Sequence, residues 1–377
     1  MLNIVFIGGE DVSARIDISN ELIRKKCQIE ILGSESFDNF IASGIKYQQF
    51  YLNREFNILD DIKSLFSIRK ILKQYNKPTI VHAFDTKLTI LLPIAAIGLQ
   101  NIKVVRTING MGRIFTVSNY KNIVLKFVYR CIQKSLKGFV DYTIFQNSDN
   151  YNYFLENNLV KKENSGVVKS SGINLKDYSN PVKEECKTKL RSELNINDKQ
   201  PTFVLISRLI KQKGVLNFLE AAQKTFDNGY KFNFLLVGQI DSNKDAISLN
   251  TIQSYAISVK YLGKRNDVKE ILSISDVFVL PSYYSEGVPR VLLEASASGL
   301  VLLGTDMPGC KDVVIDDYNG KIIEIKNSED LFEKMIYVLK DKDRIKEFSK
   351  NSIEHVQNFS LDFVTNKCFE IYKNVWL

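Results

Sequence analysis

Short apolar runs alternate with amphipathic stretches along the first half of the chain. Residues 3–9, NIVFIGG, predict a strand, and residues 11–26 predict a helix. Further runs that predict strands are residues 28–33, 80–84, 102–108 and 141–147. Several are rich in β-branched residues and lack a clean polar alternation, which is typical of strands buried on both faces. Strands of this kind alternating with helices predict a parallel α/β sheet.

The same pattern restarts after a polar stretch, residues 178–199. Residues 202–209 predict a strand and residues 215–226 a helix. The later runs that predict strands are residues 232–238, 258–263, 276–282 and 300–306. We therefore expect two Rossmann-like α/β domains facing across a cleft, residues 1–172 and 173–360. Ligands of such sheets bind beyond the carboxyl ends of the strands, so we expect the site in that cleft.

The composition narrows the class of protein. A chain of 377 residues, 45% hydrophobic and 25% charged, is typical of a globular protein with more than one core. The apolar run at residues 89–99 is interrupted by Pro93 and is shorter than the ~18 residues of a membrane span. The first residues read as a buried strand and not as a signal peptide. Five scattered cysteines without a CxxC, and two histidines, argue for reduced thiols and against a zinc site.

The surplus of positive charge lies in one half of the chain. Residues 1–170 hold 23 Lys and Arg against 15 Asp and Glu, whereas the remaining residues hold 28 of each. An anionic partner of the first half, such as a membrane surface, is one explanation, and a solubilising surface is the other. Residues 120–139 predict a basic amphipathic helix, with Lys126, Arg130 and Lys134 on one face. It would lie on an anionic membrane, or else pack its apolar side on the sheet.

Two carboxylates eight positions apart stand out after the predicted strand at residues 276–282. Glu286 lies in the turn YYSEG, and Glu294 lies about a turn and a half into the helix that opens near Pro289. The two are separated by roughly 10 Å. A carboxylate accepts hydrogen bonds from paired hydroxyls, and free N–H groups at a helix start bind anions. The spacing therefore suits a ligand with a sugar at one end, phosphate in the middle and ribose at the other.

A second segment supplies positive charge for such a phosphate. In SRLIKQKGV, Arg208 and Lys213 lie at the carboxyl end of a predicted strand. Both side chains can reach one phosphate group from there, Arg through its fork and Lys as a point charge. Gly214 permits close backbone approach, and Gly238 ends another strand at the same edge. The second half therefore predicts a site for a nucleoside diphosphate.

Residues 202–325, which contain these motifs, closely resemble the GT-B glycosyltransferases of family 4. The E-x7-E signature of that family is formed here by Glu286 and Glu294. The first half resembles the family more loosely, through FIGG, HAFD and VVKSSGIN. In detail, the chain resembles bacterial enzymes that extend lipid-linked oligosaccharides for O-antigen, capsule or protein glycosylation. The resemblance implies a GT-B fold whose C-terminal helix, about residues 361–377, packs back on the first domain. It also implies retaining transfer from a nucleotide sugar without a metal.

The resemblance assigns roles on the donor side. Arg208 and Lys213 fall on positions that bind the donor diphosphate, Glu286 on the acid that contacts the sugar, and Glu294 on the acid that contacts the ribose. The other positions implied to bind the donor are Gly9 in its glycine turn, Gly238, Arg265 near the base, and Gly287 and Val288 through their backbone. Arg208, Lys213 and Glu286 are expected to act in catalysis together with His82.

The acceptor side is implied to include His82, Asp85 and Asn109. A lone histidine such as His82 is as readily a structural core residue. Asn109 stands where many relatives have a histidine, and an asparagine cannot shuttle a proton. Asp341 and Asp343 form a D-x-D, the metal signature of another glycosyltransferase architecture, but they lie in a charge run and are interpreted as surface residues.

The predicted function is retaining, metal-independent and cofactor-free glycosyl transfer. A hexose or N-acetylhexosamine would move from a UDP-linked sugar to a polyprenyl-diphosphate-linked glycan in O-antigen or capsule synthesis. The enzyme would be cytoplasmic and peripheral on the anionic inner face of the membrane. One alternative is a sugar-nucleotide 2-epimerase of similar architecture. A second, a basic nucleic-acid-binding protein, lacks a recognised module, so we expect no nucleic acid partner.

Overall fold

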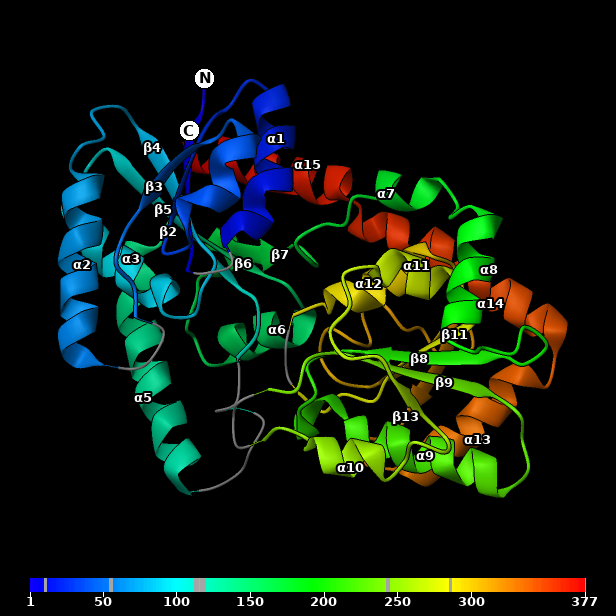
Figure 1. Cartoon of the computed structure of the whole chain (residues 1–377). Helices are drawn as coiled ribbons and strands as arrows, with labels where there is room; N and C mark the ends of the chain where they lie inside the picture. The colour runs from blue at the N-terminus through cyan, green and yellow to red at the C-terminus, as the bar shows by residue number, and fades with distance from the viewer. Residues whose placement is uncertain are drawn as a thin grey trace. The chain divides into compact units, whose positions relative to one another are not determined.

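The chain divides into two compact units (Figure 1). Unit 1 comprises Met1–Gly172 and Leu361–Leu377, and unit 2 comprises Ile173–Ser360. The structure, a computed structural model, describes residues 1–9, 12–53, 57–111, 115, 120–241, 245–284 and 287–376. Each unit holds one parallel sheet with helices around it, which confirms the predicted class of two α/β domains.

The sheet of unit 1 has seven strands in the order β3-β2-β1-β4-β5-β6-β7. Their bounds are β1 (Asn3–Ile7), β2 (Gln28–Gly33), β3 (Lys46–Gln49), β4 (Thr79–Ala83), β5 (Ile102–Ile108), β6 (Tyr142–Phe145) and β7 (Ser165–Val167). The two edge strands, β3 and β7, were not predicted, because each is short and β3 is largely polar. The order reverses between β1 and β4, and ligands of such sheets bind at the carboxyl ends beside the reversal.

Helices of unit 1 cover this sheet. Their bounds are α1 (Ile16–Arg24), α2 (Ile58–Leu72), α3 (Leu88–Ala96), α5 (Tyr120–Leu136), α6 (Ser148–Glu156) and α15 (Leu361–Trp376). The single helix predicted over residues 11–26 is wrong at its start, where Val12–Arg15 form a 3-10 turn before α1. The last helix, α15, packs against α1 and buries Val364, Cys368 and Tyr372 in the core of unit 1.

The sheet of unit 2 has six strands in the order β10-β9-β8-β11-β12-β13. Their bounds are β8 (Thr202–Ile206), β9 (Asn233–Val237), β10 (Lys260–Tyr261), β11 (Val277–Leu280), β12 (Val301–Thr305) and β13 (Gly320–Ile323). The helices are α7 (Lys176–Ser179), α8 (Glu184–Glu193), α9 (Val215–Asp227), α10 (Leu249–Gln253), α11 (Val268–Ser273), α12 (Arg290–Ala297), α13 (Ser328–Leu339) and α14 (Lys342–His355). The edge strand β13 was not predicted. The order reverses between β8 and β11.

Neighbouring residues of one strand enter opposite cores, which explains the missing polar alternation. In β11, Val277 and Val279 pack in one hydrophobic cluster, whereas Phe278 and Leu280 pack in the other. Every residue of β4, β8, β11 and β12 is buried. Because no face of these strands is left for polar groups, the polar groups that can act on a ligand lie at the strand ends.

The D-x-D of the sequence belongs to a helix cap. The Asp341 carboxylate is the N-cap of α14 and accepts hydrogen bonds from the backbone N–H groups of Asp343 and Arg344. Asp343 lies on the surface and pairs with Lys346 at 3.5 Å. The start of helix α14 therefore explains why Asp341 and Asp343 occur at this spacing.

Candidate functional site

The predicted donor-binding residues of unit 2 follow the carboxyl ends of neighbouring strands. Arg208 and Lys213 follow β8, and Gly287, Val288 and Glu294 follow β11. These two strands are paired at the point where the strand order reverses. The described residues of the site therefore converge on the place where an open parallel sheet binds ligands.

The loops after β8 and β11 are held together by their backbones. A Cβ atom on Gly214, whose φ is +71°, would lie 2.0 Å from the carbonyl oxygen of Pro281. The Tyr283 N–H donates to the Gln212 carbonyl at 2.9 Å, and the Ser282 hydroxyl donates to the same oxygen at 3.3 Å. Only glycine fits this close approach, so the basic turn after β8 is fixed against the segment that leads to α12.

The loops after β9 and β10 join the same edge. A Cβ on Gly238 would lie 1.8 Å from the Ser207 carbonyl oxygen, and the Gly238 N–H donates to the Gly263 carbonyl at 2.9 Å. Arg265 follows Gly263 and donates to both carboxylate oxygens of Asp267, at 2.8 and 2.6 Å. These bonds raise the pKa of Arg265 and hold its guanidinium in place.

The two predicted phosphate-binding cations differ in exposure. The Arg208 side chain is 62% exposed and lies 3.6 Å from a carboxylate oxygen of Asp241. Lys213 ends the 3-10 turn Lys211–Lys213 and is 8% exposed. An exposed guanidinium and a buried ammonium thus follow the same strand end, where the strand order reverses.

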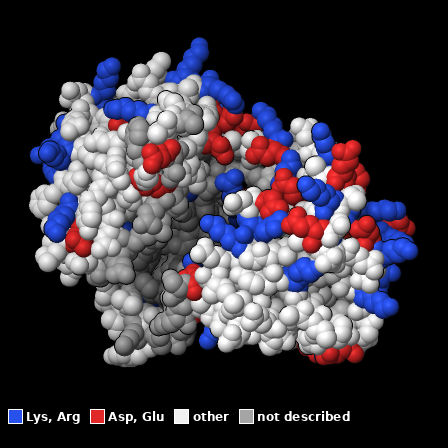
Figure 2. All heavy atoms as spheres, in the orientation of Figure 1, with Lys and Arg blue, Asp and Glu red and all other residues white. Residues whose placement is uncertain are grey.

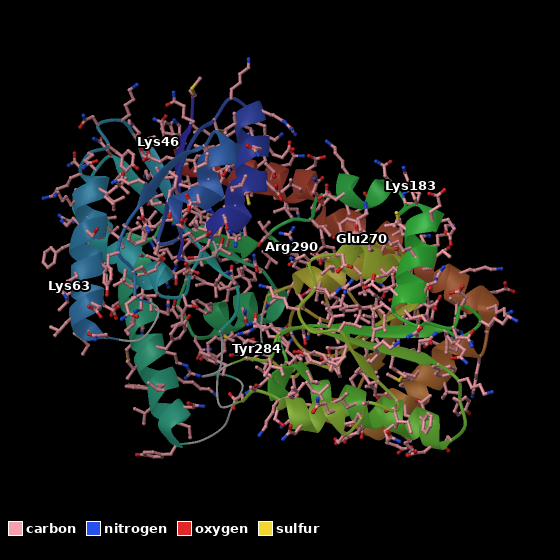
Figure 3. All side chains as sticks on the ribbon, in the orientation of Figure 1. Lys46, Lys63, Lys183, Glu270, Tyr284 and Arg290 are labelled. Carbon is pink, nitrogen blue, oxygen red and sulfur yellow. The ribbon has the colours of Figure 1, made fainter. Side chains whose placement is uncertain are left out.

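Glu294 is the described carboxylate of the E-x7-E pair. Its side chain is 17% exposed and accepts a hydrogen bond from Arg290 Nε at 3.1 Å. Burial raises the pKa of Glu294, and Arg290 opposes this rise. Glu286 lies outside the described residues. Tyr284 and Arg290, which are labelled in Figure 3, are described residues near it in the sequence.

The start of α12 lies one residue later than predicted. Pro289 is the N-cap, and the first helical residue is Arg290. Gly287 and Val288 therefore lie in the turn before the helix, and Val288 packs against the core. Their N–H groups precede the positive end of the helix, which is where an anion is favoured.

The candidate residues of unit 1 that follow strand ends are Gly9, Asp85 and Asn109. They follow β1, β4 and β5, and the Gly9 N–H donates to the Asp85 carboxylate. The Asn109 side chain donates to the Phe84 carbonyl at 3.1 Å, while its Oδ1 is buried without a hydrogen-bond partner. These three residues lie at the carboxyl edge of the sheet, where Gly9 was predicted to face the donor and Asp85 and Asn109 the acceptor.

His82 lies inside β4 and is 1% exposed. Its Nδ1 lies 2.6 Å from the Tyr372 hydroxyl and its Nε2 lies 2.7 Å from the Thr107 hydroxyl. Burial lowers the pKa of His82 well below its ordinary value, so the ring is neutral. Both ring nitrogens are therefore engaged, one with a hydroxyl of α15 and the other with a hydroxyl of β5. Such an arrangement is typical of a histidine with a structural role. Its participation at the reaction centre stays a prediction.

The sequence reasoning missed three residues that interact with the predicted site residues. Arg290 pairs with Glu294 and Asp241 pairs with Arg208. Tyr178 is close enough to Glu294 for that carboxylate to help raise the pKa of the phenol, after the larger effect of burial. The i, i+4 spacing of Arg290 and Glu294 on a helix was a usable signal. Asp241 and Tyr178 come from other segments, so the sequence held no local signal for them.

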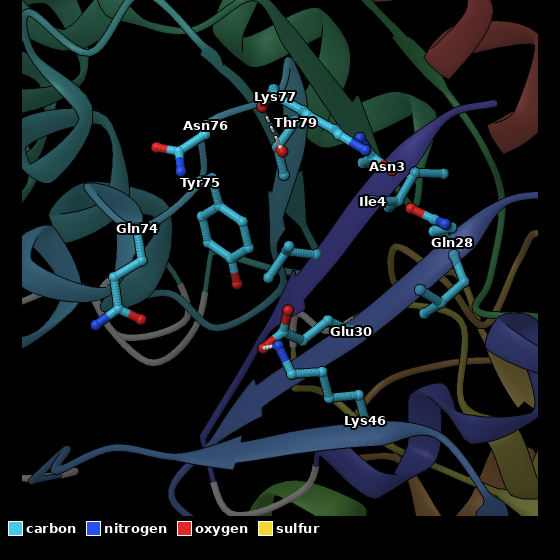
Figure 4. A pocket seen from close by; sticks show the side chains of 12 residues that line it. Asn3, Ile4, Gln28, Glu30, Lys46, Gln74, Tyr75, Asn76, Lys77 and Thr79 are labelled. Carbon is cyan, nitrogen blue, oxygen red and sulfur yellow. Dashed lines mark hydrogen bonds and ion pairs between the residues drawn. The ribbon is translucent and has the colours of Figure 1, made fainter.

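A cavity of about 440 Å³ lies at the opposite edge of the unit 1 sheet (Figure 4). It is lined by residues at the amino ends of β1–β4, including Glu30, which pairs with Lys46 at 3.0 Å. Because ligands of parallel sheets bind at the carboxyl ends, we do not assign this cavity to the site. Over the described part of the chain, no cluster of three or more His, Cys, Asp or Glu could hold a metal ion.

Comparison with known proteins places the chain in a sequence family. The family described as glycosyl transferases group 1 matches residues 187–355. The Campylobacter jejuni N,N'-diacetylbacillosaminyl-diphospho-undecaprenol alpha-1,3-N-acetylgalactosaminyltransferase is 32% identical over 315 residues, which cover 83% of this chain and 81% of that protein. The Escherichia coli UDP-Gal:alpha-D-GlcNAc-diphosphoundecaprenol alpha-1,3-galactosyltransferase is 27% identical over 90% of this chain and 93% of its own length.

Solved structures share the fold. A glycosyltransferase from Rickettsia africae superposes with a TM-score of 0.80 at 21% identity and covers 99% of this chain and 98% of its own. Anabaena HepE, solved with UDP, superposes with a TM-score of 0.81 at 16% identity and covers 99% of this chain and 100% of its own. At these identities the likeness concerns the fold, and it agrees with the GT-B architecture.

Gly214→Ala should displace the basic turn after β8. The new Cβ would overlap the Pro281 carbonyl, so the turn has to move and nucleotide affinity should fall at least about tenfold. Gly229→Ala is the matched control, because Gly229 has a similar φ of +79° but nothing within 4 Å of its Cβ position. The control should lose only ~1–2 kcal/mol of stability and keep its affinity. Calorimetric titration with UDP measures both, and equal affinities would disprove the steric argument.

The raised pKa of Glu294 predicts how UDP affinity depends on pH. The ionised carboxylate accepts hydrogen bonds on both oxygens and more strongly than the protonated acid, so UDP affinity should fall as the pH drops through a pKa raised above 4.5. The same raised pKa means that the contribution of Glu294 to folding stability decreases as the pH rises through this window. Arg290→Gln removes the opposing charge and should move the loss of UDP affinity to higher pH. Titrations at several pH values test this, with Glu294→Gln as the control that should show no such loss.

Proposed function

This chain belongs to the group 1 glycosyltransferases, and we propose that it transfers a hexose or N-acetylhexosamine from a UDP-linked sugar to a glycan carried on polyprenyl diphosphate. The observation that supports the donor half of this proposal is the convergence of Arg208, Lys213 and Glu294 at the reversal point of the unit 2 sheet. The proposal for the acceptor rests on relatives whose names specify diphospho-undecaprenol-linked acceptors.

In the proposed complex, Arg208 and Lys213 bind the diphosphate of the donor. The exposed Arg208 leaves Asp241 for the phosphate, and the buried Lys213 meets it from the protein interior. The N–H groups of Gly287 and Val288 add the positive end of α12. Glu294 accepts hydrogen bonds from the ribose hydroxyls, with Arg290 keeping it ionised. The Arg265 segment lies nearer the base, and Glu286 holds the transferred sugar.

The same cations act when the sugar–phosphate bond breaks. Negative charge then develops on the leaving diphosphate, and groups already fixed in place stabilise it without reorganising. Because two side chains and a helix start neutralise this charge, we propose that transfer needs no metal. We also propose that the acceptor attacks from the face that the diphosphate leaves. A phosphate oxygen takes its proton, and the anomeric configuration is retained.

Unit 1 is proposed to bind the acceptor. Asp85 and Asn109 lie at the carboxyl edge of its sheet, and the unpartnered Asn109 Oδ1 can accept a hydrogen bond from a sugar hydroxyl. The product would be a glycan precursor for O-antigen or capsule, made at the inner face of the cytoplasmic membrane. In the described residues, no helix is both long and apolar enough to cross a bilayer.

Arg208→Ala should weaken UDP binding by about 1.5–3 kcal/mol, because a charged hydrogen bond of that size is lost. The first measurement is a metal-free calorimetric titration of the variant and the parent with UDP, GDP and ADP. Lys211→Ala is the matched control, since Lys211 belongs to the same basic turn and is exposed at the surface. UDP affinity that is unchanged in Arg208→Ala would remove this residue from the site.

Transfer itself is tested with UDP-sugars and a synthetic polyprenyl-diphosphate glycan. Glu286→Gln should lower turnover more than UDP affinity, because the carboxylate contacts the transferred sugar and not the nucleotide. Nuclear magnetic resonance of the product then gives its anomeric configuration. Full activity of the variant would refute the role of Glu286. An inverted product would refute the proposed same-face attack.

A further inference from the structure

The outer face of α2 carries an exposed apolar stripe. Ile58, Leu59, Ile62 and Phe66 are between 45% and 70% exposed. At about 100° per residue they occupy one continuous stripe of the helix surface. Large apolar side chains gathered on one helix face of a folded unit mark a surface that another body covers.

The charged residues of α2 are distributed unevenly about this stripe, with lysines along it and aspartates outside it. Lys63, Lys70 and Lys73 are exposed along it, and Lys63 is labelled on this helix in Figure 3. The acidic residues of the helix, Asp60 and Asp61, lie outside the stripe by the same helical geometry and are ion-paired, Asp61 with Lys87 at 2.6 Å. The exposed stripe is therefore apolar and basic.

The outer face of α5 has the same character. Its exposed apolar residues, between 45% and 81% exposed, are Tyr120, Ile123, Val124, Leu125, Phe127 and Val128. Among the described side chains of this helix, only Gln133 and Leu136 are buried. An ordinary surface helix would pack its apolar side on the sheet, whereas α5 presents most of it outward.

The two stripes belong to one flank of unit 1. Both α2 and α5 pack against α3, and Figure 1 draws them on the same side of this unit. Figure 2 shows Lys and Arg side chains along the flank that carries α2. Residues 86–140, which include α5, contain nine Lys or Arg and no Asp or Glu. This segment accounts for the positive surplus of the first half of the chain.

We infer that the stripes of α2 and α5 together form a docking surface for an anionic lipid bilayer. The apolar side chains would enter the boundary between headgroups and acyl chains, while the lysines contact the headgroups. A second copy of the chain is the less suitable occupant, because it would bring two positively charged surfaces together. The docking surface would bring unit 1 to a lipid-linked acceptor, and in this respect the inference rests on the proposed function.

The cysteines of the chain supply a test that needs no engineered site. Cys131 is exposed on α5 and Cys186 is exposed on α8 of unit 2, whereas Cys27, Cys310 and Cys368 are buried. An environment-sensitive fluorophore would be placed on Cys131 in the Cys186→Ser protein, and on Cys186 in the Cys131→Ser protein. With vesicles of phosphatidylcholine and phosphatidylglycerol, the Cys131 probe should shift to shorter wavelength and the Cys186 probe should not. Equal shifts, or none, would overturn the assignment.

A pair of matched substitutions tests the role of α2. Phe66→Ser should weaken binding to the anionic vesicles about tenfold, because it removes one inserted aromatic ring. Phe226→Ser, at an exposed phenylalanine of α9 in unit 2, should leave binding unchanged. Vesicles of pure phosphatidylcholine should bind the parent protein weakly. Equal effects of the two substitutions, or a solution dimer that Phe66→Ser dissociates, would overturn the proposal.

UDP titration of the same proteins separates this inference from the proposed function. Phe66→Ser and the labelled proteins should bind UDP like the parent, since neither α2 nor α5 contributes to the donor site. Loss of vesicle binding with intact UDP binding would overturn the docking surface alone. Absence of UDP binding with intact vesicle binding would overturn the donor site alone.

Discussion

The parallel pairing of β8 with β11 is the constraint on which the candidate donor site depends. Phe203 opposes Val277 in this pair, and all residues of both strands are buried. Two strands that are covered on both faces present polar groups only beyond their ends. The reversal of strand order at this pair then directs the two following loops to one place. Gly214 lets these loops touch, which joins the basic turn to Pro281 directly after β11.

The charges at this edge are arranged before any ligand arrives. Arg208 is exposed and pairs with Asp241, Lys213 is buried, and the partly buried carboxylate of Glu294 pairs with Arg290. Each group has a position set by packing or by an ion pair, and in the proposed complex Arg208 exchanges Asp241 for the diphosphate. Such preorganisation is the main way in which proteins stabilise developing charge. Burial raises the pKa of Glu294, and the ion pair with Arg290 opposes this rise.

Unit 1 differs from unit 2 in two features, a buried histidine in its core and an apolar, basic flank on its surface. His82 is neutral and uses both ring nitrogens to connect Tyr372 of α15 with Thr107 of β5. The C-terminal helix is thereby part of this unit, although nearly 190 residues separate it from the rest. The flank formed by α2 and α5 is apolar and basic, whereas the donor edge of unit 2 is polar. The positive surplus in the first half of the chain thus corresponds to the proposed contact with lipid. The nucleotide site proposed in the second half corresponds to donor binding.

The amino-acid pattern by itself predicted the fold class, the resemblance to the family, the strand end followed by Arg208 and Lys213, and the helix that carries Glu294. It could do so because buried strands and glycine turns leave local signals in hydrophobicity and spacing. Short edge strands such as β3 and β13 left no such signal. Only the tertiary structure decided that Asp241 holds Arg208, that His82 is enclosed by α15, and that the apolar side of α5 is exposed. These facts depend on contacts between distant segments, and helical periodicity shows which face is apolar without showing what covers it.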